Sequence, residues 1–162
     1  MKKQILIFLV LLMTFSVIAQ QKRIKQNQVP QKVRQAFKAK YPDVDVKSWE
    51  KKNETYIGKY RWNKKKYKVT FDMNGKWIKT VTELKWKEVP ESVKIVYNKS
   101  TYKKWRIDNI MQVDSSSGSI VYILEIDNQF NFPVTESSTV LYETDDVYIS
   151  KNGEIIKVLK KN

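Results

Sequence analysis

The sequence predicts an α+β protein built from two tandem units, each a helix followed by an antiparallel meander. Val29-Pro30 and Val89-Pro90 both precede apolar residues three, six and seven positions after the proline. Proline is tolerated in the first helical turn, and that spacing marks one helix face. A period-two alternation typical of half-buried strands follows each motif, and each stretch ends near an Asn-Gly pair, a strong hairpin signal. We therefore expect units at residues 29–86 and 89–162.

Residues 1–19 have the features of a cleaved secretory signal peptide. Lys2 and Lys3 precede an apolar run over residues 5–18, and Ala19 offers a small residue for cleavage. The run is shorter than the roughly 20 apolar residues that span a bilayer, so we expect cleavage and no membrane span afterwards. Residues 20–28 hold one apolar residue in nine, which predicts a flexible mature N-terminus. The protein is therefore expected to be exported, either periplasmic or secreted.

The composition disfavours an enzyme. The 162-residue chain has no His and no Cys, which removes the commonest general base, the commonest metal ligand and the thiol nucleophile. Asp43-x-Asp45 and Asp145-Asp146 lack the glycine and distal glutamate of a calcium loop, so we interpret them as turn and loop carboxylates. No base and nucleophile pair can be placed for a hydrolase that uses Ser, Lys or carboxylates. We expect no catalytic residue, no metal and no cofactor.

The charge of the chain favours an anionic partner. Outside residues 1–19 there are 29 basic and 17 acidic residues, a net charge of +12. The run Lys64-Lys65-Lys66 lies beside Trp62 and Tyr67, a mixture that can bind single-stranded nucleic acid by charge and stacking. The simpler interpretation, lysines on the solvated face of a strand, is favoured because export removes the usual nucleic-acid targets.

In the first unit, a helix is expected over residues 30–40, because Pro42 disfavours helical geometry at the residue before it. Alternating apolar and polar residues predict strands at residues 56–62, 66–71 and 76–82. Asn74-Gly75 predicts a two-residue type I′ turn, in which both positions have positive φ. Together these signals indicate a meander of about four strands after the helix.

The second unit repeats this order with more spacing. It is expected to hold a helix at residues 90–100 and strands at residues 105–113, 120–126, 147–149 and 155–158. The two Asn-Gly pairs are 78 residues apart and the two prolines 60, so the second unit carries 18 extra residues. The polar stretches at residues 114–118 and 128–139 best accommodate them, and loops of this kind are candidates for unit-specific function.

A series of motifs runs through the whole chain after the signal. In the first unit they are Val-Pro-x-x-Val-x-x-Ala-Phe at 29–37, Tyr41-Pro42, Trp49, Tyr56, Tyr67-x-Val-x-Phe71-Asp72, Asn74-Gly75 and Trp77-x-x-Thr80. In the second they extend from Val89-Pro90-x-x-Val93 to Asn152-Gly153-Glu154-Ile155-Ile156. This order resembles the small exported proteins called PepSY-like, with a fold similar to the β-lactamase-inhibitory protein. The resemblance implies two units whose sheets join into one curved surface, helices packed on one face, and no catalytic residues.

The expected turns assign the two faces of the sheet. Around a two-residue turn, Phe71 would lie opposite Ile78 on the core face, and Trp77 would lie on the open face. The second Asn-Gly pair likewise places Tyr148 and Ile155 on the open face. The predicted partner-binding residues are Arg61, Lys68, Trp77, Lys79, Tyr148, Ile155 and Lys157.

An open sheet face that mixes aromatic and basic side chains has the composition of a binding surface. We therefore expect an exported, non-enzymatic binding module, an inhibitor or sensor of a protein or peptide partner in the cell envelope. Two alternatives stay open. Trp77 and Tyr148 could instead tuck under the long loops of the second unit as ordinary packing. Net charge alone could bind an anionic envelope polymer, in which case binding would collapse as salt is raised.

Overall fold

The computed structural model describes residues 21–128 and 143–161, which form one antiparallel sheet of nine strands in sequence order. The strands are β1 (Lys22–Ile24), β2 (Ser48–Lys52), β3 (Thr55–Trp62), β4 (Lys65–Asp72), β5 (Trp77–Glu83), β6 (Arg106–Ser115), β7 (Ile120–Asp127), β8 (Thr144–Ser150) and β9 (Ile155–Lys161). Helices α1 (Gln31–Lys40) and α2 (Glu91–Lys99) follow the short 3-10 helices η1 (Gln26–Gln28) and η2 (Trp86–Glu88). The expected signal at residues 1–19 and most of the expected loop at residues 128–139 lie outside the described residues.

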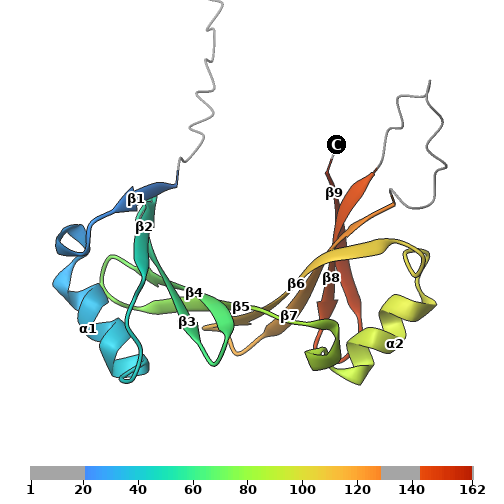
Figure 1. The fold of residues 1–162 in the computed structure, drawn as a ribbon, viewed down its shortest axis with the longest axis horizontal. Helices are drawn as coiled ribbons and strands as arrows, with labels where there is room; N and C mark the ends of the chain where they lie inside the picture. The colour runs from blue at the N-terminus through green and yellow to red at the C-terminus, as the bar shows by residue number, and fades with distance from the viewer. Residues whose placement is uncertain (1–20, 129–142, 162) are drawn as a thin grey trace, which may run out of the picture.

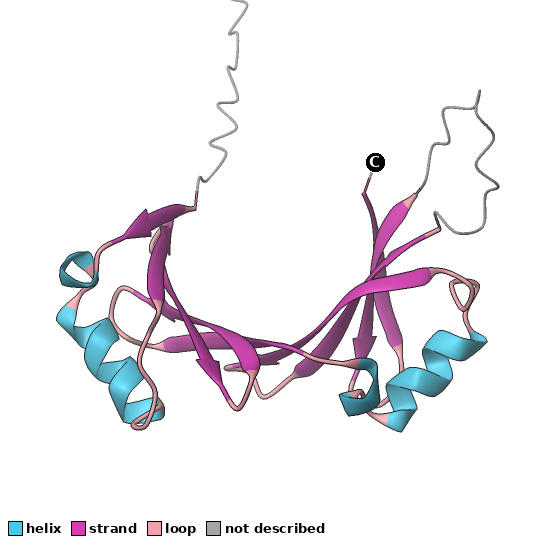
Figure 2. Cartoon of the chain, in the orientation of Figure 1, coloured by secondary structure: helices cyan, strands magenta, loops and turns pink. Residues whose placement is uncertain are grey.

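The sheet is strongly curved. Figure 1 shows the strands forming a trough, with α1 and α2 outside its two ends. Figure 2 shows that the helices are confined to these ends and that the middle of the molecule is built from strands. The inner, concave face of the trough is therefore left uncovered by both helices, which bears directly on where a partner could bind.

Each helix packs on its own hydrophobic cluster. In α1, Val33 and Phe37 are buried, and in α2 the residues 60 positions later, Val93 and Tyr97, are buried. The first cluster consists of Val29, Val33, Phe37, Trp49, Tyr56, Tyr60, Val69 and Phe71. The second consists of Val89, Val93, Tyr97, Ile110, Tyr122, Leu124, Ile126, Val147 and Ile149. The apolar spacing that predicted the two helices is thus the set of side chains that anchors them.

Both clusters lie on the same side of the sheet. Residues directly opposite each other on neighbouring strands point to the same face. Tyr67, which packs on the first cluster, pairs with Thr82, Thr82 pairs with Gln112, and Gln112 pairs with Tyr122 of the second cluster. This chain of pairs runs along the outer, convex face, so the alternate residues of each strand point into the concave face.

The first Asn-Gly turn is wider than expected. The N–H of Gly75 donates to the carbonyl of Asp72 (3.1 Å), and the N–H of Asp72 donates to the carbonyl of Lys76 (3.0 Å), which leaves a loop of three residues. Within this loop only Gly75 has a positive φ, at 84°. The prediction of a two-residue type I′ turn is therefore wrong, and the turn ends instead in one left-handed glycine. The second pair behaves identically, with Gly153 at φ 86°.

Packing against the helices explains why both turns take this form. A Cβ on Gly75 would lie 2.7 Å from the carbonyl oxygen of Lys32, and one on Gly153 would lie 2.9 Å from that of Ser92. The Ser92 hydroxyl also donates to the carbonyl of Lys151 at 2.8 Å. Each hairpin tip therefore presses on the first turn of its helix, and glycine is required there for close approach as well as for φ.

The N-terminal segment is ordered, so the expectation of a flexible stretch at residues 20–28 is wrong for the part described. Strand β1 pairs with β2, with Ile24 opposite Trp49. Ile24 packs on the first cluster, and the Lys25 N–H donates to the Gln28 side chain at 2.9 Å. The single apolar residue of this polar segment is the one that anchors it.

Candidate binding face

The concave face consists of cross-strand rows that run through most of the sheet. One row consists of Arg61, Lys66, Glu83, Met111, Ile123, Tyr148 and Lys157. The neighbouring row consists of Lys59, Lys68, Val81, Val113, Val121 and Ser150. In both rows the side chains are charged in the N-terminal half of the chain and become apolar towards β6 and β7.

An apolar patch lies over β5 to β8 on this face. We define it as Val81, Met111, Val113, Val121, Ile123 and Tyr148, all of them half-buried. Each member is directly opposite at least one other on the neighbouring strand, so the patch is continuous. Contiguous apolar side chains on an open surface mark interaction sites more often than scattered ones do. At the outer margin of the patch, the Lys157 ammonium lies 4.3 Å from the centre of the Tyr148 ring.

A basic patch adjoins it over β1 to β4. We define it as Arg23, Lys47, Lys59, Arg61, Lys66 and Lys68, which line a depression of about 360 Å³. Two carboxylates, Glu50 and Glu83, lie in the same depression, so its lining carries a net charge of +4.

The two carboxylates are engaged by neighbouring lysines. Glu83 pairs with Lys66 at 2.7 Å and Glu50 pairs with Lys59. Burial raises the pKa of Glu50, but hydrogen bonds from Lys59 and Gln21, together with the charges of Lys59 and Lys68, more than offset this and leave the pKa below its ordinary value. Glu50 is therefore ionised at neutral pH, and the excess charge of the depression is positive.

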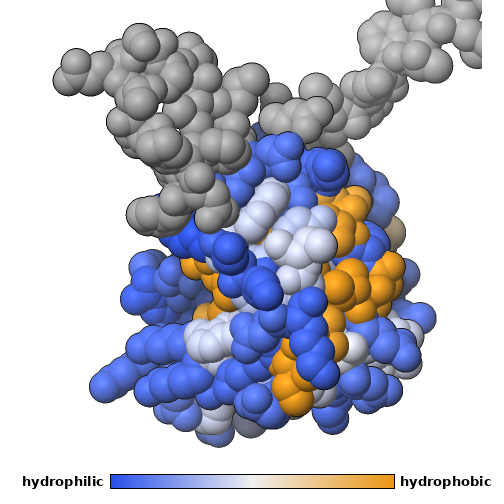
Figure 3. All heavy atoms as spheres, turned by 90° about the vertical axis from the view of Figure 1, so that its right-hand side faces the viewer, coloured by the Kyte–Doolittle hydropathy of each residue, from blue (hydrophilic) through white to orange (hydrophobic). Residues whose placement is uncertain are grey.

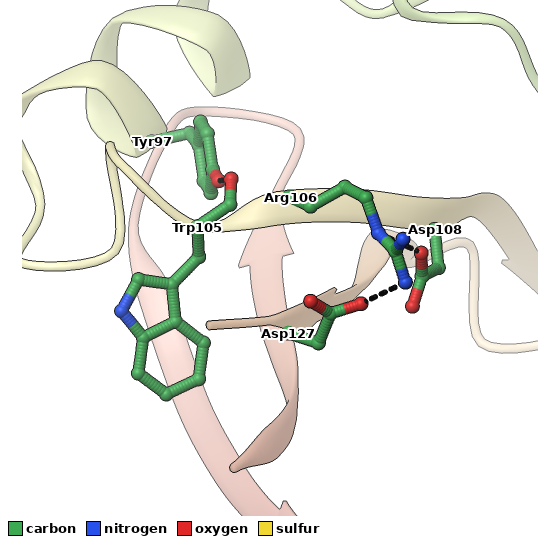
Figure 4. A network of polar contacts seen from close by, with 5 residues as sticks. All are labelled: Tyr97, Trp105, Arg106, Asp108 and Asp127. Carbon is green, nitrogen blue, oxygen red and sulfur yellow. Dashed lines mark hydrogen bonds and ion pairs between the residues drawn. The ribbon is translucent and has the colours of Figure 1, made fainter. Parts of the chain in front are cut away.

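Towards the opposite end of the sheet, one arginine is shared by two carboxylates. Figure 4 shows Arg106, at the start of β6, paired through Nε with Asp108 at 2.7 Å and through Nη2 with Asp127. Burial and then a hydrogen bond with Asp127 raise the pKa of Asp108, which Arg106 opposes. In the same view the Tyr97 hydroxyl donates to the carbonyl of Trp105 at 2.8 Å, which ties α2 to the start of β6. These contacts join the start of β6 to the end of β7 and to α2.

Five of the seven predicted binding residues have the expected orientation. Their pairings place Arg61, Lys68, Lys79, Tyr148 and Lys157 on the concave face. Lys79 is exposed and Tyr148 is half-buried. The five extend over both patches, from β3 to β9.

The orientation predicted for Trp77 and Ile155 is wrong. Trp77 lies opposite Phe71, and Ile155 lies opposite Ile149, because Ile78 and Ile156 are extra residues that shift the pairing just after each turn. Trp77 therefore packs on the first cluster, where its indole N–H donates to the Thr80 hydroxyl at 3.0 Å. The wider turn and the shift that follows it turn both side chains to the convex face.

The sequence reasoning missed most of the apolar patch. Met111, Val113, Val121 and Ile123 were not among the predicted binding residues. A signal was present: Val121 and Ile123 alternate with the buried residues Tyr122 and Leu124, so β7 is apolar on both faces. A strand of this kind is expected where the second face is also covered or used for binding.

Over residues 21–128 and 143–161, no group of three or more acidic residues could hold a metal ion. In the same residues no helix is long and apolar enough to cross a membrane. The concave face combines basic side chains, the carboxylates of Glu50 and Glu83, half-buried apolar side chains and Tyr148.

Comparison with solved structures identifies the fold. A protein from Bacteroides eggerthii, described as one of the "putative periplasmic proteins", superposes with a TM-score of 0.71 at 16% identity. The superposition covers 82% of this chain and 88% of that one. A DUF2874 family protein from Bacteroides uniformis superposes with a TM-score of 0.69 at 22% identity, over 81% and 88%. A BLIP-like protein from Bacteroides fragilis superposes with a TM-score of 0.66 at 23% identity, over 81% and 86%.

Sequence comparison gives the family. No curated protein of matching sequence was found. The family described as "Putative beta-lactamase-inhibitor-like, PepSY-like" matches residues 16–61 and again residues 59–157. These two matches cover most of the chain and agree with the fold of the solved structures. The protein belongs to this PepSY-like family.

Proposed function

We propose that this protein is an exported, non-enzymatic binding module, periplasmic or secreted, that holds a protein or peptide partner of the cell envelope in its concave face and acts as an inhibitor or sensor of it. Family membership supports a binding role, and the apolar run after Lys2 and Lys3 supports export. The periplasmic description of one structural relative agrees with this location.

The observation that carries the proposal is the continuity of the two patches. Val81 of the apolar patch lies directly opposite Lys68 of the basic patch, so one partner surface can contact both. Such a partner presents an apolar segment beside an acidic one, since apolar anchors supply affinity and opposite charges steer the encounter.

We further propose that residues 29–86 and 89–162 are two tandem units with their helices on one face of a shared sheet. The family matches the chain twice, and each half has its own hydrophobic cluster. In each half a turn glycine approaches the first turn of the helix: Gly75 approaches Lys32, and Gly153 approaches Ser92. The two helix residues, Lys32 and Ser92, are 60 positions apart. The partner would then span both units.

A paired truncation tests the concave face. The protein is used to capture partners from an envelope fraction, and the captured partner is then titrated against Tyr148→Ala and, as the control, Trp62→Ala. Trp62 is 52% exposed and belongs to the convex side. We expect Tyr148→Ala to weaken binding by about 2 kcal/mol, the range of an interface hot spot, and Trp62→Ala to leave it unchanged. The reverse order of effects would place the partner on the convex side.

A second candidate is binding of an anionic polymer by the basic patch, favoured by the net charge of +4 around the 360 Å³ depression. Polyphosphate is a suitable probe. Binding by charge alone falls steeply between low and moderate salt, whereas an apolar interface largely persists. Retention of the captured partner at moderate salt, together with loss of polyphosphate binding, would favour the protein partner.

A further inference from the structure

The outer edge of β9 is a second surface that can accept a partner. Strand β9 is last in the sheet, so only its β8 side is paired within residues 21–128 and 143–161. Alternate residues of such a strand direct their N–H and C=O groups away from the sheet, which leaves them available to another chain.

The two edges of the sheet differ in length. At the other edge, β1 has three residues, whereas β9 has seven and pairs with β8 along Thr144–Ser150. A very short strand is a common way to protect an edge from unwanted pairing. Edge β1 is protected in this way and edge β9 is not.

Exposed aliphatic side chains gather on β9. Ile155, Ile156 and Leu159 are 42%, 54% and 44% exposed, and they are half of the six strongly exposed large apolar residues in the described structure. Figure 3 views the end of the molecule that holds α2, β8 and β9, and shows apolar surface between hydrophilic patches there. Together with open backbone groups, these side chains offer a strand both hydrogen bonds and apolar contacts.

The charge of β9 indicates what kind of strand fits. Lys157, Lys160 and Lys161 are basic, and residues 155–161 include no carboxylate. Lys161 pairs with Asp146 at 2.6 Å and Lys157 lies 4.3 Å from the centre of the Tyr148 ring, yet all three lysines are exposed. Opposite charges on directly paired strands stabilise the pair, and like charges destabilise it.

A second copy of β9 fits poorly for the same reason. Antiparallel pairing of two copies would bring six lysines together along one pair of strands with no carboxylate among residues 155–161. The complementary pattern is that of an extended segment of another protein. Such a segment would place acidic residues opposite the lysines and apolar residues opposite Val158 and Leu159.

We propose that β9 is a docking edge for an acidic, extended segment of another protein, which adds to the sheet as a tenth strand. The open backbone edge of β9 lies outside the apolar and basic patches, but the Lys157 side chain lies beside Tyr148 on the concave face. Peptides altered only in their backbone therefore separate this interaction from the proposed partner of that face.

A designed peptide tests the proposal. The probe is a capped Glu-Glu-Val-Val-Glu-Val-Val peptide, whose acidic residues fall opposite the three lysines in antiparallel pairing. Two further versions carry N-methyl groups on alternate residues, in the two possible phases. Because only alternate N–H groups of a strand face its neighbour, one phase should lose binding at least about tenfold and the other should bind like the parent. Equal binding of all three versions would show simple charge attraction and overturn the proposal.

Charge reversal on β9 supplies the second arm. Lys157→Glu with Lys160→Glu should weaken peptide binding at least about tenfold, and the parent peptide should slow amide hydrogen exchange across residues 155–161. The matched control, Arg34→Glu with Lys38→Glu, reverses two exposed charges on α1 and should change affinity less than about twofold. Equal losses in both variants, or no binding at all, would refute the proposal. A different outcome in sedimentation is a dimer whose population rises with protein concentration and falls in the Lys157→Glu, Lys160→Glu variant. That result would assign the edge to a second copy of this chain.

Discussion

Replacing Gly75 with alanine tests the contact between the first hairpin tip and α1. Gly75 has φ +84°, and an added Cβ would lie 2.7 Å from the carbonyl oxygen of Lys32 and 3.1 Å from its carbonyl carbon. Gly118, in the turn between β6 and β7, is a matched control because it has φ +82° and would bring a Cβ within 4 Å of nothing. The two substitutions share the backbone strain and differ in the steric contact.

The expected losses of unfolding free energy follow from these two terms. A left-handed backbone costs alanine about 1–2 kcal/mol, so Gly118→Ala should destabilise the protein by that amount. Overpacking adds about 1–3 kcal/mol, which brings Gly75→Ala to about 2–5 kcal/mol. Gly153→Ala should resemble Gly75→Ala, since its Cβ would lie 2.9 Å from the Ser92 carbonyl oxygen.

Urea denaturation of the wild type and the three variants measures these differences through the linear dependence of unfolding free energy on urea concentration. Equal destabilisation by Gly75→Ala and Gly118→Ala would refute the steric argument, because it would show that the hairpin tip does not press on the helix. A loss at Gly75 without a comparable loss at Gly153 would refute the equivalence of the two contacts.

Two further predictions concern stability. Phe71 is 1% exposed, so Phe71→Ala should lower the free energy of unfolding by about 3–5 kcal/mol. Trp77→Ala should lower it by about 2 kcal/mol, because truncating a half-buried side chain removes fewer buried contacts. A negligible effect of Trp77→Ala would instead place Trp77 on the open face. Asp145 is 2% exposed with Oδ2 unpartnered, and burial raises its pKa while Lys160 opposes this. Its contribution to stability is then greatest when it is protonated and is lost as pH rises through the folded pKa. Asp145→Asn should therefore stabilise the protein at pH 7 by about 1 kcal/mol, and melting curves should show the gain disappearing below about pH 4; a gain that persists at low pH would contradict this.

Local sequence rules were sufficient for both helices and most strands, and insufficient for β1, β2 and two turns. The helix motifs and the period-two alternation predicted α1, α2 and strands β3 to β9, whereas the segment of β1 was expected to be flexible and no bounds were predicted for β2. An Asn-Gly pair is compatible with a two-residue turn and with a three-residue turn that ends in a left-handed glycine. The choice depends on the approach of Gly75 to Lys32, a contact between residues 43 positions apart. A tertiary contact of this kind cannot be read from the turn itself.

The same limitation explains the error at Trp77 and Ile155. Side chains alternate between the two faces of a strand, so a shift of one residue in the strand pairing moves every later side chain to the opposite face. The wider turns make such a shift, and the extra residues at Ile78 and Ile156 restore the original phase. Lys79 and Lys157 lie beyond these bulges and keep the predicted face, as does Tyr148, which lies opposite Lys157. Trp77 and Ile155 lie between the turn and the bulge. The error is therefore confined to the residues at each bulge, Trp77 with Ile78 and Ile155 with Ile156.

The distribution of chemistry on the concave face follows from how the rows cross the sheet. Strands β5 and β6 meet at the centre, where Val81 pairs with Val113. The basic patch is built from strands before this seam, and five of the six apolar-patch residues come after it. The basic patch lies wholly in the first half and most of the apolar patch lies in the second, and the joined sheet places the two patches side by side on one curved surface. The pairing of β5 with β6 is therefore the structural feature that turns two chemically different halves into a single candidate binding face.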